Sequence, residues 1–350
     1  MDWAGIRAEF PALERWTYLN TATYGQMPTR SMNAVARHWE RRNELGCTDF
    51  LDWYTDAERI RGSIAQLIHA SPDDIAFVPN AAAALSIVVA GLGLQAGDNI
   101  VTFHDEFPNY QYTATARTID ERTRLVAFSE VNYSTGLRAP LDEMLRVTRE
   151  RGIPLFLDGS QSVGALTFDV TRTPVDVLAV HGYKWLCSPT GAGFMYVSPE
   201  MRRRLPPNII GWRSHHEWRN VADLHHGTPV FKESAEKYEG GGLPFSLLYP
   251  MEASVNMLLE IGPEVIERRV LGLATLIRSM FAGMGAEVVD SGSQIVAALL
   301  PGRDVGEVVR GLRAQNVIVT ARHGRLRVAP HFYNNEDDVE RLGAALVAGL

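Results

Sequence analysis

Lys184 is the residue whose position in this sequence most directly suggests chemistry. It follows the apolar run Val177-Leu-Ala-Val180, and a glycine-rich turn and a second apolar run come after it, up to residue 197. The chain has only three lysines, and a charged ammonium that is buried without a partner is costly. One interpretation is that the stem of Lys184 packs while its ammonium reaches solvent. The other is that the amine forms a Schiff base with an aldehyde cofactor.

Asp158 ends a second apolar run, Pro154-Leu-Phe-Leu157, and is followed by Gly-Ser-Gln-Ser. A carboxylate at such a position is partly desolvated and needs a cation or strong donors to remain charged. The pyridinium nitrogen of pyridoxal phosphate would be such a cation, and its protonation makes that cofactor an electron sink. The alternative is that Asp158 is the N-cap of a following helix.

Small side chains begin a helical segment directly after a third strand-like run. Asn80 is a suitable N-cap, and Ala81 and Ala82 would leave the first backbone amides open to a phosphate group. A strand followed by an alanine-rich helix is common, so this pattern is weak by itself. His181 and Tyr183, on either side of the lysine turn, could donate to the same phosphate or could be ordinary packed side chains.

Two other side chains could contact the remaining parts of such a site. Phe107 lies before Pro108 on a stiff loop and could stack on a cofactor ring, although a core position is the alternative. Arg327 is a lone arginine in a short apolar strand, and its planar guanidinium suits a substrate carboxylate. A structural salt bridge is the alternative for Arg327.

An alternation of strands and helices would bring these residues together. Strands are predicted at 75–78, 99–103, 124–128, 154–158, 175–180 and 193–197, and helices at 32–56, 55–69, 81–90, 110–119 and 141–151. Continuous apolar strands between helices are typical of a mostly parallel sheet that is covered on both faces. Ligands of such sheets lie beyond the carboxyl ends of the strands, which is where the candidate residues fall.

A change of pattern near residue 250 indicates a second, smaller unit. A glycine loop at 238–244 is followed by a long helical run to about residue 283, and then by strands predicted at 295–300, 317–320 and 326–328. The sequence therefore predicts an N-terminal arm over 1–30, a large domain over 31–255 and a small C-terminal domain over 256–350.

Composition excludes several classes of protein. The net charge of -7 argues against nucleic acid or an anionic membrane as the partner. No run approaches the ~20 apolar residues of a membrane span, and the first residues do not have the pattern of a signal peptide, so a cytoplasmic protein is expected. The two cysteines, Cys47 and Cys187, do not form a CxxC pair, so neither a disulfide framework nor a metal site is expected.

The motifs at 157–164 (LDGSQSVG) and 181–185 (HGYKW), supported by those at 130–136 and 328–334, resemble class V aminotransferase-like, fold-type I pyridoxal-phosphate enzymes. This group contains cysteine desulfurases, isopenicillin N epimerase-like proteins and kynureninases, and the resemblance covers nearly the whole chain. It implies a mostly parallel seven-stranded sheet in the large domain and a small C-terminal α/β domain. It also implies pyridoxal 5'-phosphate as the cofactor and a homodimer with active sites at the subunit interface.

The resemblance also implies roles for individual residues. It implies that Lys184 forms the Schiff base, that Asp158 lies on the pyridine nitrogen, that Gln161 lies near the phenolic oxygen and that Arg327 binds the substrate carboxylate. The remaining cofactor contacts that it implies are Ala81, Ala82, His181, Tyr183 and Trp212 around the phosphate, Phe107 stacked on the ring, Asn132 and Thr135 beside it, and Gly241 and Gly242 from a loop that enters the neighbouring protomer's site.

Four further residues are candidates for the substrate pocket, and any of them could instead lie on the surface: Tyr24, Arg213, His215 and His216.

The expected activity is chemistry at the Cα atom of an amino-acid substrate. No cysteine follows Cys187, whereas cysteine desulfurases need one in the C-terminal domain, so a β-elimination of the C–S lyase type without a protein persulfide is favoured. An aminotransferase and an amino-acid epimerase are the main alternatives, and a kynureninase-like hydrolase is a weaker one. A non-catalytic binding protein of the same fold is disfavoured because Lys184, Asp158 and Arg327 are all retained.

Overall fold

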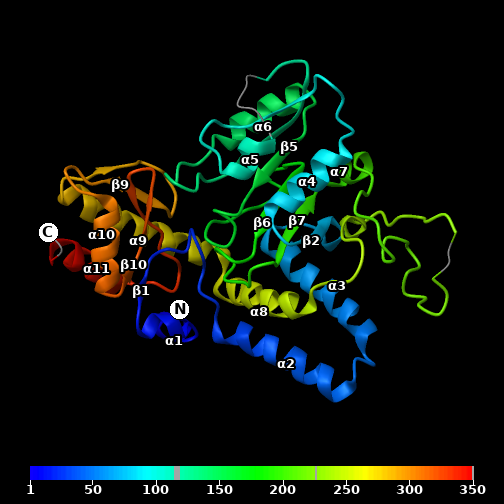
Figure 1. Cartoon of the computed structure of the whole chain (residues 1–350), viewed down its shortest axis with the longest axis horizontal. Helices are drawn as coiled ribbons and strands as arrows, with labels where there is room; N and C mark the ends of the chain where they lie inside the picture. Colours follow the sequence, from blue (N-terminus) through cyan, green and yellow to red (C-terminus); the bar gives the residue numbers. More distant parts are fainter. Residues whose placement is uncertain (114–118, 225–226, 349–350) are drawn as a thin grey trace.

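A mostly parallel sheet forms the centre of the molecule in the computed structural model, which describes residues 1–113, 119–224 and 227–348 (Figure 1). Its strand order is β2-β7-β6-β5-β4-β3, in which β3, β4, β5 and β6 are parallel to one another and β7 is antiparallel to both β6 and β2. The strands are β2 (Ile75–Val78), β3 (Asn99–Val101), β4 (Thr123–Ser129), β5 (Leu155–Asp158), β6 (Val177–His181) and β7 (Gly193–Val197). The predicted α/β fold class is confirmed.

The number of strands differs from the expectation of seven. Within the described residues the sheet has six strands, and these correspond to the six apolar runs of the sequence. The seventh strand was implied by the family resemblance and not by any apolar run, which is why that number was wrong here.

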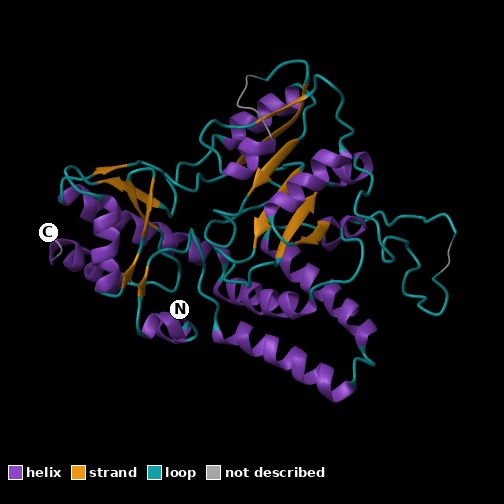
Figure 2. Cartoon of the chain, in the orientation of Figure 1, coloured by secondary structure: helices purple, strands orange, loops and turns teal. Residues whose placement is uncertain are grey.

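Helices cover both faces of this sheet (Figure 2). Because successive side chains of a strand point to opposite faces, Phe77 belongs to one core while its neighbours Ala76 and Val78 belong to another. The first core includes α3 (Phe50–Leu67), α6 (Leu141–Glu150) and α8 (Phe245–Ile261). The second includes α4 (Ala81–Gly91), α5 (Pro108–Thr113) and α7 (Pro199–Arg204). The strands are buried on both faces, which explains their continuous apolar sequences.

A smaller antiparallel sheet, β11-β12-β9-β8, builds the C-terminal unit. Its strands are β8 (Glu287–Val288), β9 (Val296–Leu299), β11 (Thr320–Arg322) and β12 (Arg325–Val328), and its core includes α9 (Pro263–Gly283), α10 (Val305–Ala314) and α11 (Glu336–Ala348). The segment predicted as one strand at 317–320 is divided. Its first part, β10 (Val317–Ile318), pairs in parallel with β1 (Thr17–Tyr18) of the N-terminal arm.

Glycines divide two of the predicted helical segments, each into two helices. The helix predicted at 32–56 is two helices, α2 (Thr29–Leu45) and α3, because Gly46 takes a left-handed conformation with φ of 56°. The long helical run after residue 249 breaks in the same way at Gly262, where φ is 93°, and Pro263 begins α9. Part of the helix predicted at 110–119 is found as α5, and residues 114–118 lie outside the described residues.

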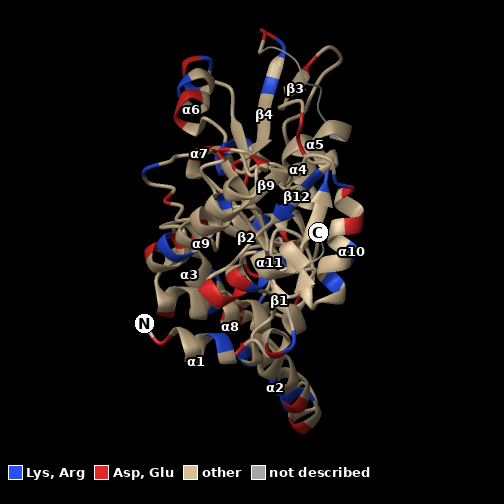
Figure 3. Ribbon diagram, turned by 90° about the vertical axis from the view of Figure 1, so that its left-hand side faces the viewer, with Lys and Arg blue, Asp and Glu red and all other residues tan. Residues whose placement is uncertain are grey.

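The remaining short elements are α1 (Trp3–Ala8) and the 3₁₀ helices at Pro11–Glu14, Pro72–Asp74 and Ala235–Tyr238. Acidic and basic side chains are interspersed on α6 and α10 (Figure 3). None of the helices in the described part of the chain combines the length and apolarity that crossing a bilayer requires.

Candidate active site

Lys184 lies three residues beyond the end of β6 and is only 9% exposed. Burial lowers the pKa of its amine to about 8, although the charge of Asp158 acts in the opposite direction. Its Nζ atom lies 5.8 Å from the ring centroids of both Phe107 and Tyr183. The amine is therefore enclosed by side chains and does not fit the interpretation of a solvated ammonium.

The turn that carries Lys184 is held from several parts of the chain. The Gly25 amide of the arm donates to the Tyr183 carbonyl at 2.8 Å, and a Cβ atom at Gly25 would lie 1.9 Å from the Lys184 carbonyl oxygen. The ring nitrogen Nε1 of Trp185 donates to Gln161 at 2.8 Å, and the Trp185 carbonyl lies 2.9 Å from Nε2 of His331. The position of the lysine is thus fixed by the arm, the large sheet and the C-terminal unit.

Asp158, at the end of β5, accepts one hydrogen bond on each carboxylate oxygen. The Tyr110 hydroxyl donates to Oδ2 and the Ser160 amide donates to Oδ1, both at 2.8 Å. The Ser160 bond closes a local turn, and no helix begins there, so the N-cap interpretation is wrong. Among the described residues Asp158 forms no ion pair, although it is 8% exposed.

A second buried carboxyl, Glu106, lies close enough for the charge of Asp158 to affect it. Glu106 accepts hydrogen bonds from the Ser129 amide at 2.8 Å and the Ser129 hydroxyl at 2.7 Å, and it too lacks an ion pair in the described chain. Burial raises the pKa of Glu106, and Asp158 raises it further. This end of the site is short of positive charge.

Several predicted phosphate contacts have no hydrogen-bond partner among the described residues. Asn80 caps α4 by accepting the Ala83 amide at 2.8 Å, and the first-turn amides of Ala81 and Ala82 have no helical carbonyl to bond. The Nδ1 atom of His181 is buried without a hydrogen-bond partner among the described residues. Burial lowers the pKa of His181 to about 4, so the neutral imidazole prevails at neutral pH.

Arg327 is buried at 1% exposure, and its guanidinium has no carboxylate partner in the described residues. It donates to the Tyr133 carbonyl and, at 2.6 Å, to the Thr23 hydroxyl, while its Nε atom has no partner there. Burial lowers its pKa to about 9. The alternative of a structural salt bridge is therefore wrong within the described chain, and this cation is suited to receive an anion.

Two of the aromatic residues predicted to lie in the site, Phe107 and Tyr24, are not buried in a hydrophobic core. Phe107 is 39% exposed, and its ring meets Tyr133 edge to face at a centroid distance of 5.2 Å. Tyr24 is 50% exposed and packs on Tyr183 with centroids 4.9 Å apart. Both rings therefore have accessible surface close to Lys184.

Three residues that were predicted to contact the cofactor ring form hydrogen bonds with other parts of the protein. Gln161 accepts from Trp185 and donates to the Ala22 carbonyl at 3.0 Å. Asn132 accepts from the backbone and hydroxyl groups of Ser134 and Thr135, and the Thr135 hydroxyl donates to Asn132 at 3.0 Å. Asn132 and Thr135 thus shape the loop after β4, and their contact with the cofactor ring stays a prediction.

Arg213 has carboxylate partners within the chain, unlike Arg327, and its predicted place in a substrate pocket stays a prediction. It is 2% exposed and forms ion pairs with Glu236 and Glu239, and it also donates to the Gly241 carbonyl at 3.0 Å. Its charge is therefore already neutralised. Sequence position alone could not separate this arginine from Arg327, because neither ion-pair partner lies next to it in the sequence.

Trp212 lies beside the glycine loop. Its indole is 39% exposed and meets Trp218 at a centroid distance of 5.4 Å, and a Cβ atom at Gly241 would lie 3.9 Å from it. Gly242 has open space around it. Nothing within one described chain brings Trp212, Gly241 or Gly242 to Lys184. The predicted contact of Trp212 with the phosphate and the predicted entry of the glycine loop into the neighbouring protomer's site both stay predictions.

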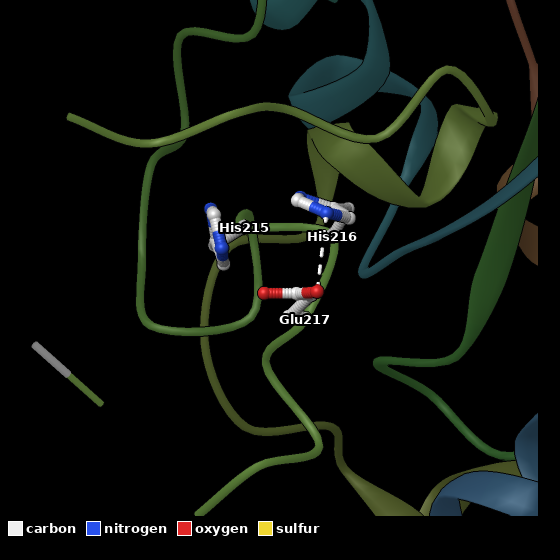
Figure 4. Close-up of side chains that lie close together, drawn as sticks. All are labelled: His215, His216 and Glu217. Carbon is white, nitrogen blue, oxygen red and sulfur yellow. Dashed lines mark ion pairs between the residues drawn. The ribbon is translucent and has the colours of Figure 1, made fainter. Parts of the chain in front are cut away.

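His215 and His216 form a small cluster with Glu217 on the loop after α7 (Figure 4). The Nδ1 atom of His215 accepts the Val230 amide at 3.0 Å, so the proton of the neutral ring is on Nε2. Nε2 of His216 lies 3.7 Å from a Glu217 oxygen. A metal would have to displace a proton or a backbone bond from His215, so we interpret the cluster as part of the loop structure.

Sequence reasoning missed Tyr110 and Glu106. Both lie in or just after the segment 104–109 that follows β3, and a strand-end position is the signal that could have identified Glu106. Tyr110 and Tyr112 are two residues apart in the same helix, and their types do not show which one points to Asp158.

Comparison with known proteins gives a consistent result. The family model described as "Aminotransferase class-V" matches residues 107–342. Isopenicillin N epimerase of Streptomyces clavuligerus is 27% identical, over 99% of this chain and 98% of that protein. A probable cysteine desulfurase of Methanothermobacter thermautotrophicus is 22% identical, over 99% and 98%. A solved structure of C-DES with glycine covalently linked to its PLP cofactor has a TM-score of 0.87 at 21% identity, over 97% and 98%.

Proposed function

This chain belongs to the class-V aminotransferase family of pyridoxal-phosphate-dependent enzymes, and we propose that it catalyses a β-elimination at an amino-acid substrate without a protein persulfide. The observation that supports a charged cofactor and substrate at this site is a set of buried charges without counter-ions in the described chain. The cations Lys184 and Arg327 and the carboxyls Asp158 and Glu106 form no ion pairs among the described residues. Because buried charges are costly without partners, these groups are suited to a bound, charged ligand.

The residues present fit pyridoxal 5'-phosphate. When bound, this cofactor supplies an electron sink for negative charge that develops on the substrate Cα atom. Lys184 would hold its aldehyde carbon and Asp158 its pyridinium nitrogen. The Ala81 and Ala82 amides and the unpartnered Nδ1 atom of His181 would hold its phosphate.

The substrate would be oriented by Arg327. The Thr23 hydroxyl and the Tyr133 carbonyl fix the guanidinium, and the free Nε atom is left to donate to the substrate carboxylate. Phe107 and Tyr183 would exclude water from the amine of Lys184, because both rings lie within 6 Å of it.

Lys184 would then move the proton. With a pKa of about 8, a useful fraction of its amine is neutral near pH 7, so Nζ can remove the proton from Cα. The bond from Cβ to its substituent breaks, and the substituent leaves with the bonding electrons. A sulfur leaving group would be released as a thiol after it takes up a proton.

Cys187, which lies three residues beyond Lys184, supports a route in which it does not carry a persulfide. Cys47 lies between α2 and α3. Cys187 is 1% exposed, and burial raises the pKa of its thiol, so it is a poor nucleophile. A thiol for persulfide formation would have to be more accessible and more acidic than Cys187.

Epimerisation is the alternative that a specific observation favours, because a relative that is 27% identical is named as an isopenicillin N epimerase. The test is to incubate the holoenzyme with a panel of amino acids and cysteine S-conjugates in D2O, and to follow pyruvate, ammonia and exchange at Cα by NMR. Pyruvate and ammonia without an oxo-acid acceptor are expected. Exchange with inversion and no pyruvate would favour an epimerase, and turnover that requires an acceptor would favour an aminotransferase.

Lys184→Ala gives the matched test of the site, with Lys232→Ala as the lysine control. Turnover and the absorbance of covalently attached cofactor should be lost only in the Lys184 variant. Retention of both would contradict the assignment of Lys184.

A homodimer is part of the proposal. The loop between α7 and the 3₁₀ helix Ala235–Tyr238 projects from the body at the right of the view (Figure 1). It exposes apolar side chains, with Ile210 61% exposed and Val230 59% exposed. A second copy of the chain would cover this surface and complete its site with Gly241 and Gly242. Light scattering on the full chain should give twice the monomer mass, and a monomer would reject this arrangement.

A further inference from the structure

The hydroxyl of Tyr110 is the single side-chain donor that the described residues offer to Asp158. The Tyr110 ring is 1% exposed and packs in the core between the sheet and α4, with Phe156 at a centroid distance of 6.2 Å. A buried phenol needs a hydrogen-bond partner, and the partner here is Oδ2 of Asp158 at 2.8 Å. The tyrosine cannot turn away from the carboxylate without disturbing its packing.

The helix that carries Tyr110 is short and lies next to the site. It begins at Pro108, directly after Phe107, whose ring lies 5.8 Å from Nζ of Lys184. The Phe107 amide in turn lies 3.3 Å from an oxygen of Glu106. One short segment thus presents an exposed ring on the lysine side and a buried hydroxyl to the carboxylate.

The neighbouring charge gives this hydroxyl a chemical role. Glu106 is buried nearby, and the charge of Asp158 raises the pKa of its carboxyl. Among the described residues neither carboxyl has a cationic partner, so directed donors are what hold them. For Asp158 the side-chain donor is the Tyr110 hydroxyl, and a hydrogen bond from it orients the carboxylate.

We propose that Tyr110 is a positioning residue that orients the Asp158 carboxylate toward the ring nitrogen of the cofactor. This inference rests on the proposed function, in which Asp158 faces that nitrogen. Ser160 fixes one carboxylate oxygen and Tyr110 fixes the other, so the group cannot rotate between two orientations. Without the phenol, one carboxylate oxygen of Asp158 would lose its fixed direction, and its contact with the ring nitrogen would be weaker.

The test is Tyr110→Phe, which keeps the packed ring and removes only the hydroxyl. Tyr112→Phe is the matched control, because Tyr112 belongs to the same helix but is 86% exposed. The holoenzymes would be titrated with pH while the absorbance of the bound cofactor is followed, and the rate of cofactor release on dialysis would be measured. Loss of a hydrogen bond to a charged group should raise the pH midpoint of the absorbance change by about one unit and speed release about tenfold.

A double-mutant cycle separates a role through Asp158 from a general effect on the fold. In an Asp158→Asn background, Tyr110→Phe should change neither the midpoint nor the release rate further. Equal effects in both backgrounds, or a Tyr110→Phe holoenzyme that matches Tyr112→Phe, would overturn the proposal. The products formed from amino acids play no part in these measurements, so a wrong reaction type would leave their outcome unchanged.

Discussion

Two groups of buried arginines differ in how their charge is neutralised. Arg61 and Arg213 are each 2% exposed and share Glu239, with Arg61 2.5 Å and Arg213 3.3 Å from its carboxylate. Arg327 is equally buried, but its donors meet a carbonyl and the neutral side chains of Thr23 and Asn20. Burial alone would lower the pKa of either kind of arginine. The charge of Glu239 raises the pKa of Arg61, whereas the pKa of Arg327 falls to about 9.

The difference separates structural charge from functional charge. Arg61 and Arg213 support the fold beside the 3₁₀ helix Ala235–Tyr238, and the chain itself supplies their counter-ion, Glu239. Within the described residues Lys184 and Arg327 form no ion pair, and a charged ligand is proposed to neutralise this part of the site. A buried charged residue is therefore informative about function mainly when its partner is missing.

The largest effect is expected from Glu239→Gln, which leaves Arg61 and Arg213 without their shared carboxylate. Breaking a buried ion pair by removing one partner should lower the free energy of unfolding by about 3–5 kcal/mol. Urea unfolding of the full chain measures this value. The control is Glu150→Gln, because the Arg146–Glu150 pair is exposed and should contribute at most about 1 kcal/mol. Equal losses of unfolding free energy in the two variants would show that the buried ion pairs of Glu239 stabilise the fold no more than an exposed pair.

A smaller and more selective effect is expected from Arg327→Met, which keeps much of the volume and removes the charge. The free energy of unfolding should stay within about 1 kcal/mol of the wild-type value, since no ion pair is broken. Amino-acid binding should weaken at least about tenfold, because hydrogen bonds to a charged group are worth about 1.5–3 kcal/mol. Calorimetry with a non-reacting amino acid would measure this loss. Release of the cofactor in this variant would instead show that Arg327 is structural.

The smallest effect concerns His331, a buried neutral group that links the C-terminal unit to the lysine turn. Burial lowers its pKa from 6.5 to about 3, so the unfolded chain binds one more proton than the folded protein between these two values. The stability that this group contributes is complete above pH 6.5 and is lost as pH falls toward 3, by up to about 1.4 kcal/mol per pH unit.

His331→Gln provides the comparison for this pH effect, because it retains a donor near the position of Nε2 and does not titrate. Urea unfolding at pH 7 and pH 5 should show a smaller loss of stability in the variant than in the wild type. Parallel pH dependence in the two proteins would mean that other groups account for it.

The sequence was sufficient to select candidate residues at the ends of strands, but it did not show which other side chains contact them. Lys184 and Asp158 were candidates because Asp158 ends an apolar run and Lys184 lies three residues beyond the end of another. The carboxyl ends of parallel strands lie at one edge of the sheet. The counter-ions of Arg213 come from a different segment, so nothing local distinguished it from Arg327. Tyr110 was hidden for a similar reason, since its contact with Asp158 joins residues 48 positions apart.

The pairing of the N-terminal arm with the C-terminal unit also determines when the site can form. Thr23 holds Arg327 across 304 residues of sequence, and β1 pairs with β10 in the same region. The large sheet can fold while the ribosome is still synthesising the C-terminal unit, but the guanidinium cannot be positioned until nearly the whole chain has emerged. Contacts of such long range form slowly, so the carboxylate-binding half of the site is expected to be the last part of the protein to become native.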